Sequence, residues 1–294
     1  MSKNIYLGVD VGATKTIFLT VQIKGAKYKI LEAIKVATPK VEAEILEMVE
    51  KNFMNLAEKY KIGGIGIGFC GPVDYKKGIA IKGPRLRTGE IEFKKDLEKK
   101  VKTKVAVDND VKCFLFAESA FGKAQGKKNA VFLTLGTGIG GGIIINGKIY
   151  RGAANFAGEF GHMRIGEIGK EEDFELISSG TGLVNVYKKI TGEILNSFQI
   201  VDLAQKKDFS ALMATDAVSK TLGILLANII QSLNPEIIVL GGGLSEVDLI
   251  INKAKEYAKK KVFLPVLAKT PIVVSKLGQN AIALGAAWMA SEAT

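Results

Sequence analysis

The sequence predicts an α/β protein of two lobes, and three observations support this prediction. Short apolar runs of strand length alternate with longer segments whose apolar residues recur at helical spacing. Two strand-rich stretches, one at the start of the chain and one from residue 131, each lead into a turn of glycine and threonine, which indicates two halves built on one plan. With 294 residues, of which 47% are hydrophobic, the chain can bury a substantial core and divide into two lobes.

We expect the first lobe over residues 1–108, the second over 109–278, and a C-terminal helix over 279–291 that folds back across the boundary. The first lobe is predicted to hold helices at 41–60 and 93–101 and strands at 5–10, 16–23, 28–36, 64–69 and 105–107. The second is predicted to hold strands at 131–135, 143–145, 148–151 and 236–240 and helices at 111–121, 182–191, 216–233 and 246–261.

Asp10 ends the first predicted strand, and a turn of small and hydroxyl residues follows it. Small residues let backbone N–H groups approach a phosphate, while threonine hydroxyls and a lysine add donors and charge. The turn therefore predicts a phosphate site that uses Gly12, Thr14, Lys15 and Thr16. Asp10 is expected to hold Mg²⁺ through water, since this ion gives up its water shell reluctantly. Taken alone, the motif would fit an ordinary hairpin with a surface aspartate.

A glycine-rich loop in the second lobe points to the same kind of ligand. Gly136, Gly138 and Gly141 match the pattern G-x-G-x-x-G, but a β-branched strand follows where a dinucleotide fold requires a helix. We therefore reject the dinucleotide interpretation. The loop over 136–142 is interpreted as a phosphate cradle, with Thr137 as a hydroxyl donor.

A second glycine segment, Gly241-Gly242-Gly243, ends a buried predicted strand. Bare backbone there permits a flat group, such as a nucleobase, to lie against the chain. A plain strand-to-helix turn is the alternative, although three consecutive glycines exceed what such a turn needs.

The residues 108–110 offer candidates for acid–base chemistry at a predicted helix start. Asp110 could cap the helix, or it could act as general base toward a hydroxyl that attacks phosphorus. Asn109 could orient the same substrate. Asp108 is a competing base, but its place at the strand end favours a role in supporting the turn.

The single histidine of the chain, His162, lies in a glycine-flanked segment with Glu159. A carboxylate beside an imidazole suits hydrogen bonding to adjacent sugar hydroxyls, although a lone histidine is more often structural. Glu175 could supply a further acceptor, or it could be a solvated charge in an acidic stretch.

Composition excludes several classes of protein. The net charge of +11 comes almost entirely from lysines mixed with acidic residues, and no basic stripe or recognition helix indicates nucleic-acid binding. Two cysteines in apolar contexts argue against disulfides and a thiolate zinc site. No signal peptide is recognised and no uninterrupted apolar run reaches the ~20 residues of a membrane helix. We expect a cytoplasmic protein with no membrane partner.

These motifs, in this order and over nearly the whole chain, resemble the ROK family (repressors, open reading frames and sugar kinases) of the actin-like ATPase superfamily. Gly71-Pro72-Val73 belongs to the same set. The resemblance implies two lobes of ribonuclease H-like fold that bind ATP, Mg²⁺ and a hexose. It implies Asp110 as catalytic base, and it implies sugar contacts by Gly71, Asn109, Glu159, His162 and Glu175.

The sequence departs from the family pattern at two places. Most members carry a Cys-rich zinc motif after the histidine, whereas the segment 166–172 here contains no cysteine. We therefore expect no zinc, and we expect packing to hold that loop. Arg85 stands where many members have asparagine in the sugar loop, which leaves the sugar open. No helix-turn-helix precedes Ile5, which argues against the repressor branch.

The sequence thus predicts an ATP-dependent hexose kinase of glucokinase or hexokinase type that phosphorylates a 6-hydroxyl. Its expected partners are a hexose, a nucleotide and a second copy of the chain in a homodimer. An N-acetylhexosamine or fructose kinase is the close alternative. A non-catalytic sugar-binding regulator is disfavoured, because a pure sensor needs neither Asp10 nor Asp110.

Overall fold

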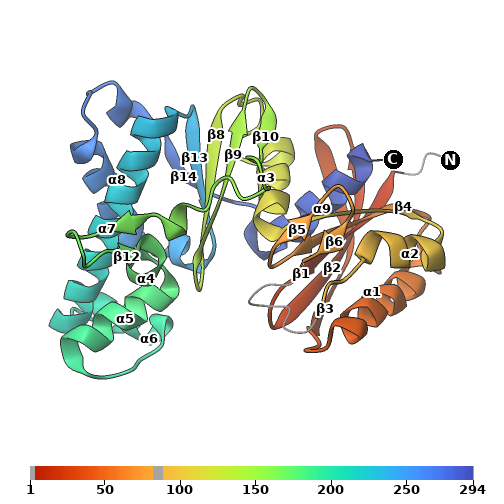
Figure 1. Ribbon diagram of the computed structural model, residues 1–294, viewed down its shortest axis with the longest axis horizontal. Coiled ribbons are helices and arrows are strands. Elements are labelled where there is room, and N and C mark those ends of the chain that lie inside the picture. The colour runs from red at the N-terminus through yellow and green to blue at the C-terminus, as the bar shows by residue number, and fades with distance from the viewer. Residues whose placement is uncertain (1–3, 82–88, 294) are drawn as a thin grey trace. The chain divides into compact units, whose positions relative to one another are not determined.

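The computed structural model describes residues 4–81 and 89–293, and the chain divides into two compact units (Figure 1). Unit 1 combines residues 1–126 with 276–294, and unit 2 covers residues 127–275. The division differs from the expected boundary at residue 108. Helix α3 (Asp110–Phe121) lies in unit 1, because it packs against the C-terminal helix α9 (Ala281–Glu292) of that unit.

Unit 1 is built on a five-stranded sheet in the order β3-β2-β1-β4-β7. Its strands are β1 (Ile5–Val11), β2 (Lys15–Lys24), β3 (Lys27–Ala37), β4 (Ile62–Phe69) and β7 (Lys104–Asn109). The first three form antiparallel pairs, while β1, β4 and β7 run parallel. A small hairpin of β5 (Val73–Asp74) and β6 (Ile79–Ala80) follows β4.

Glycines on the sheet of unit 1 allow α9 to pack unusually close to it (Figure 1). A Cβ added at Gly8 would lie 1.8 Å from the carbonyl oxygen of Ala283, and one at Gly66 would lie 1.8 Å from that of Ala286. Only glycine fits at these two strand positions. The opposite face is filled by apolar residues of α1 (Glu42–Ala57) and α2 (Phe93–Val101).

Unit 2 repeats this plan with the sheet order β10-β9-β8-β13-β14. Its strands are β8 (Ala130–Leu135), β9 (Ile139–Ile145), β10 (Lys148–Tyr150), β13 (Ile237–Gly241) and β14 (Ile272–Val274). The first three chain segments again form antiparallel pairs, and β8, β13 and β14 run parallel. The two sheets correspond strand for strand, as the two similar strand-rich openings of the sequence predicted.

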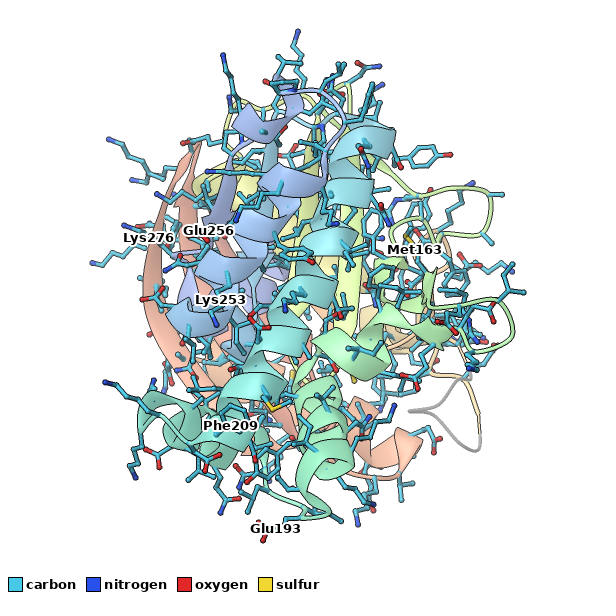
Figure 2. All side chains as sticks on the ribbon, turned by 90° about the vertical axis from the view of Figure 1, so that its left-hand side faces the viewer. Met163, Glu193, Phe209, Lys253, Glu256 and Lys276 are labelled. Carbon is cyan, nitrogen blue, oxygen red and sulfur yellow. The ribbon has the colours of Figure 1, made fainter. Side chains whose placement is uncertain are left out.

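Helices of unit 2 cover its sheet, and the core lies beneath them. They are α4 (Phe174–Ser178), α5 (Gly180–Thr191), α6 (Ser197–Gln205), α7 (Phe209–Leu233) and α8 (Asp248–Lys261), and a hairpin of β11 (Arg164–Ile165) and β12 (Glu172–Asp173) precedes them. Figure 2 shows α8 on the outer side of the unit, with Lys253 and Glu256 on its exposed face and Phe209 at the start of α7. Among the described residues, α7 alone has the length and apolarity of a membrane span, and half of that stretch is buried inside the structure, as in a core helix.

Several elements differ from the prediction for local reasons. The predicted loop over 136–142 is shorter, since β9 begins at Ile139 and its glycines pair with β8. Helix α7 begins seven residues before the expected start at 216, because Asp208 caps it by accepting the N–H of Ala211. Helices α4 and α6 and strand β14 were not predicted; they are short, and α6 depends on a capping box at Asn196.

Candidate functional site

The candidate catalytic and binding residues of unit 1 lie at the carboxyl ends of its three parallel strands. Asp10 on β1 is in register with Gly68 on β4, and Gly68 is in register with Asp108 on β7. The carboxyl ends of these strands therefore meet. The turn after β1, the turn at Gly71 and the start of α3 at Asp110 follow directly from them.

Asp10 and Asp110 form the electrostatic centre of these strand ends. The side chain of Asp10 is almost fully buried, and burial is the main reason why its pKa is raised from 3.8 to about 7. The nearby Asp110 carboxylate raises the pKa of Asp10 further, whereas the charge of Lys15 lowers it. A bound cation would offset the unfavourable negative charge of Asp10. Two carboxylates, together with water and phosphate oxygens, are ligands that suit Mg²⁺.

The three polar residues at the start of α3, Asp108, Asn109 and Asp110, make different contacts. Asn109, not Asp110, is the N-cap, and its Oδ1 accepts the N–H of Val111 at 3.0 Å. The Asn109 amide also donates to the carbonyl of Gly71 at 3.1 Å, so it ties the two turns together. Asp108 is fully buried and accepts the N–H of Asn109 at 2.8 Å, which is the supporting role expected for it. Asp110 is the first helical residue and is partly accessible.

The turn after β1 exposes some of the predicted phosphate ligands and buries one. Thr14 and Lys15 are exposed, and the Gly12 N–H closes the turn onto the Lys15 carbonyl at 3.1 Å. Thr16 is fully buried, and its hydroxyl is hydrogen bonded to that of Thr38 at 2.9 Å. Thr16 thus supports the turn from inside and is not placed to meet a phosphate, contrary to the sequence-based expectation.

In unit 2, the loop between β8 and β9 is anchored to the start of α5. The carbonyls of Gly136 and Thr137 accept the N–H groups of Gly180 and Thr181 at 2.8 and 3.1 Å. In a planar trans peptide the N–H points opposite to the C=O, so the N–H groups of Thr137 and Gly138 are directed away from α5. Two adjacent N–H groups that point the same way form an anion cradle. Sequence reasoning missed Gly180 and Thr181, although their Ser-Gly-Thr-Gly context signals a helix start.

The glycines after β13 lie beside this loop, because β13 pairs in parallel with β8 and Gly241 is in register with Thr134. Gly242 has a φ of +84°, and a Cβ there would lie 2.6 Å from the carbonyl oxygen of Leu135. This glycine is therefore required by the close approach of the two strands. A Cβ at Gly243 would meet nothing within 4 Å, which leaves open space beside the loop for a ligand.

The predicted sugar residues Glu159, His162 and Glu175 gather in unit 2. Glu159 directly precedes the 3₁₀ turn Phe160–His162, and the charges of both glutamates raise the pKa of His162, so the three side chains share one neighbourhood. Glu175 also contacts the loop between β8 and β9, since its Oε2 accepts the N–H of Ile139 at 2.7 Å. This second contact was not predicted.

An ionic network that was not predicted holds the segment after His162. Nδ1 of His162 lies 3.0 Å from Oδ2 of Asp173, and Arg164 donates to the other oxygen of Asp173. The hydrogen bond to Asp173 is the largest reason why the pKa of His162 is raised, and its counterpart lowers the pKa of Asp173. This ionic network therefore acts in addition to the packing that was expected to hold the loop. Arg164 and Asp173 face each other across the β11–β12 hairpin.

Two sets of candidate residues thus result, one in each unit. Unit 1 brings together Asp10, Lys15, Gly71, Asn109 and Asp110, and unit 2 brings together the two glycine segments with Glu159, His162 and Glu175. Arg85 lies outside the described residues. Within the described ranges, no three His, Cys, Asp or Glu side chains are grouped to hold a metal ion alone. The absence of zinc stays a prediction.

The chain is similar to known proteins over nearly its whole length. The ROK family matches residues 6–293. The N-acetylgalactosamine kinase of Shewanella sp. (strain ANA-3) is 31% identical over 278 residues, covering 88% of each chain. The glucokinase of Halalkalibacterium halodurans is 28% identical over 323 residues, covering 99% of this chain and 96% of the relative. The crystal structure of a ROK family glucokinase from Streptomyces griseus with glucose and AMPPNP has a TM-score of 0.83 at 26% identity, over 98% of this chain and 99% of that one.

The fold and the two residue sets define an α/β protein of the actin-like two-lobe class, and the predicted fold class is confirmed. The chain belongs to the ROK family.

Proposed function

We propose that this protein transfers the γ-phosphoryl group of ATP to the 6-hydroxyl of glucose or a related hexose. The coarser activity, that of an ATP-dependent sugar kinase, follows from its membership of the ROK family and its likeness to sugar kinases. The observation that best supports the proposal is the buried Asp10, whose pKa is raised by burial and by the neighbouring Asp110. A protein that only sensed sugar would gain nothing from holding two carboxylates together against their repulsion.

In this mechanism Asp110 is the general base. The 6-hydroxyl oxygen forms a bond to the γ-phosphorus, the bond from that phosphorus to the β,γ-bridging oxygen breaks, and ADP leaves with the electron pair. Asp110 accepts the hydroxyl proton. Asn109 has its amide engaged with Gly71 and its oxygen with Val111, so we assign it to shaping the sugar-facing turn.

Each unit offers donors that suit the phosphates of ATP. Lys15 and Thr14 supply charge and a hydroxyl, and the N–H groups of Thr137 and Gly138 supply the cradle. Asp10 would hold Mg²⁺ through water, and when bound this ion neutralises charge on the phosphates. The open space beside Gly243 suits the nucleobase.

The sugar is proposed to bind Glu159, His162 and Glu175, whose acceptors and imidazole suit adjacent hydroxyls. The relatives differ in their sugars, so an N-acetylhexosamine is the second candidate, favoured by likeness to the N-acetylgalactosamine kinase. We further propose that the protein is cytoplasmic and acts as a homodimer.

One experiment separates these substrates. Purified protein is incubated with ATP and Mg²⁺ and with glucose, mannose, fructose or the N-acetylhexosamines, and ADP release is followed by a coupled assay. Phosphorus and carbon NMR then locate the new phosphate on the product. A 6-phosphate of glucose or a close relative is expected; a preference for an N-acetylhexosamine favours the second candidate. Absence of turnover on every sugar would refute the proposed function.

A further inference from the structure

His162 is the only histidine of the chain. One of its two ring nitrogens, Nδ1, has a hydrogen-bond partner within the protein. Nδ1 lies 3.0 Å from Oδ2 of Asp173. Because the pKa of Asp173 is lowered, this carboxylate is ionised at neutral pH and can only accept a hydrogen bond. Nδ1 therefore carries the proton, and Nε2 is the atom left for a ligand.

Asp173 is itself held by a second donor. Arg164 donates through Nη1 to Oδ1 of Asp173 and through Nη2 to the carbonyl of Glu171, the latter at 2.8 Å. A planar guanidinium that contacts two acceptors fixes the orientation of the carboxylate better than a single point charge could. Arg164 thus orients Asp173, and Asp173 orients His162.

The backbone supports the same geometry. Arg164 pairs with Asp173 and Ile165 with Glu172 across the β11–β12 hairpin, and the N–H of Phe174 donates to the carbonyl of Met163 at 3.0 Å. The hairpin begins just after His162 and returns just before Glu175. It therefore connects the two ends of the proposed sugar-binding set.

We propose that Asp173 and Arg164 are positioning residues that hold His162 with Nε2 available to a hexose hydroxyl. The inference rests on the proposed function, because it assigns His162 to the sugar. The side chain of His162 is 60% exposed, so the imidazole is reachable from solvent and needs such a support to keep one orientation. Removing Asp173 should misorient the ring without deleting any atom that contacts the sugar.

The charged groups around His162 set the expected direction of its titration. Asp173, Glu175 and Glu159 all raise the pKa of His162, and Arg164 acts on it through Asp173. In Asp173→Asn the largest of these contributions is lost while both glutamates remain. The pKa of His162 should therefore fall but should stay sensitive to the glutamates.

The test uses nitrogen-15 NMR on the full chain without ligand, in which one imidazole gives an unambiguous signal. We expect the wild type to show the Nδ1-protonated tautomer, and we expect Asp173→Asn to lower the pKa and lose this bias, with Arg164→Lys intermediate. Asp202→Asn, which breaks an exposed ion pair on α6, is the matched control and should change nothing. An unchanged tautomer and pKa in Asp173→Asn would overturn the proposal.

Kinetics give the second readout. Asp173→Asn should raise the KM for the hexose about tenfold, the scale of losing one well-placed hydrogen bond, while the KM for ATP stays within about twofold. A shifted NMR titration with unchanged hexose KM would refute the link to sugar binding. A wild-type protein that phosphorylates no hexose would refute the proposed function instead, and the NMR result would still report on the orientation of the ring.

Discussion

Replacing Asp10 by asparagine should stabilise unit 1 at neutral pH, because the native carboxylate is held where its charge is unfavourable. Its pKa rises from 3.8 to about 7 on folding, first through burial and then through the charge of Asp110. A carboxylate with a raised folded-state pKa contributes stability while it is protonated, and this contribution is lost as the pH rises through the folded pKa. The penalty is therefore small near pH 4 and complete above pH 7.

The raised pKa of Asp10 sets the size of the effect. Raising a pKa from 3.8 to about 7 corresponds to ~4 kcal/mol of destabilisation above pH 7. Asparagine has nearly the same shape and carries no charge. The unfolding free energy of Asp10→Asn relative to the wild type should therefore grow by ~4 kcal/mol between pH 4 and pH 8 and stay level above that.

Unit 1 carries its own probe for this measurement. Trp288 is the only tryptophan of the chain, lies on α9 and packs edge-on against Phe121 with ring centroids 5.2 Å apart. Its fluorescence during urea denaturation at a series of pH values follows the unfolding of this unit. Glu44→Gln, which removes an exposed carboxylate on α1 of the same unit, is the control and should show no such growth. A difference for Asp10→Asn that is independent of pH would refute the reasoning.

Three further outcomes are expected. Asp110→Asn should lower kcat by about 10²-fold or more while sugar binding is retained, as steady-state kinetics and calorimetry will show; near-normal turnover would disprove its role as base. Metal analysis after chelation should find no stoichiometric zinc, with full activity once Mg²⁺ is restored; about one zinc per chain would contradict this. Gly66→Ala should cost about 1–3 kcal/mol or more, since its Cβ would lie 1.8 Å from the Ala286 carbonyl, whereas Gly89→Ala meets nothing within 4 Å and should be neutral in a thermal melt.

Periodicity and turn residues were sufficient to predict most strands and helices, because these signals are local. The assignment of α3 to unit 1 could not be predicted from local sequence. It depends on α9, some 170 residues later, and on the absence of a side chain at Gly285, where a Cβ would lie 1.8 Å from the Cys113 carbonyl. No pattern within α3 reports that contact. The glycines of β9 caused a different error, because they led us to predict a loop where a strand exists. Glycine weakens the sequence signal of a strand even where the backbone is fully paired.

The candidate residues were easier to name than to assign to roles. Asp10 and Asp110 were found from turn chemistry, but only the register of β1, β4 and β7 explains why they meet. Thr16 was misassigned because a sequence does not reveal on which side of a turn a hydroxyl lies. Asp173 was missed although a signal existed: Arg164 and Asp173 flank a stretch with Gly166 and Gly169, which is the pattern of a hairpin that brings opposite charges face to face.

The two units share one sheet plan but have diverged in what their strand ends present, and this division of labour fits phosphoryl transfer. The strand ends of unit 1 present carboxylates and a lysine, which in the proposed mechanism hold a cation and accept a proton. The loops of unit 2 present backbone N–H groups and the open positions Gly136 and Gly243, which in the proposed mechanism accept phosphate and a flat base. The carboxylate of Glu175, which lies against this loop, accepts the N–H of Ile139. In the proposed mechanism Asp10 would hold the cation. The two copies of one sheet plan therefore offer different chemistry at their strand ends, as the proposed mechanism requires.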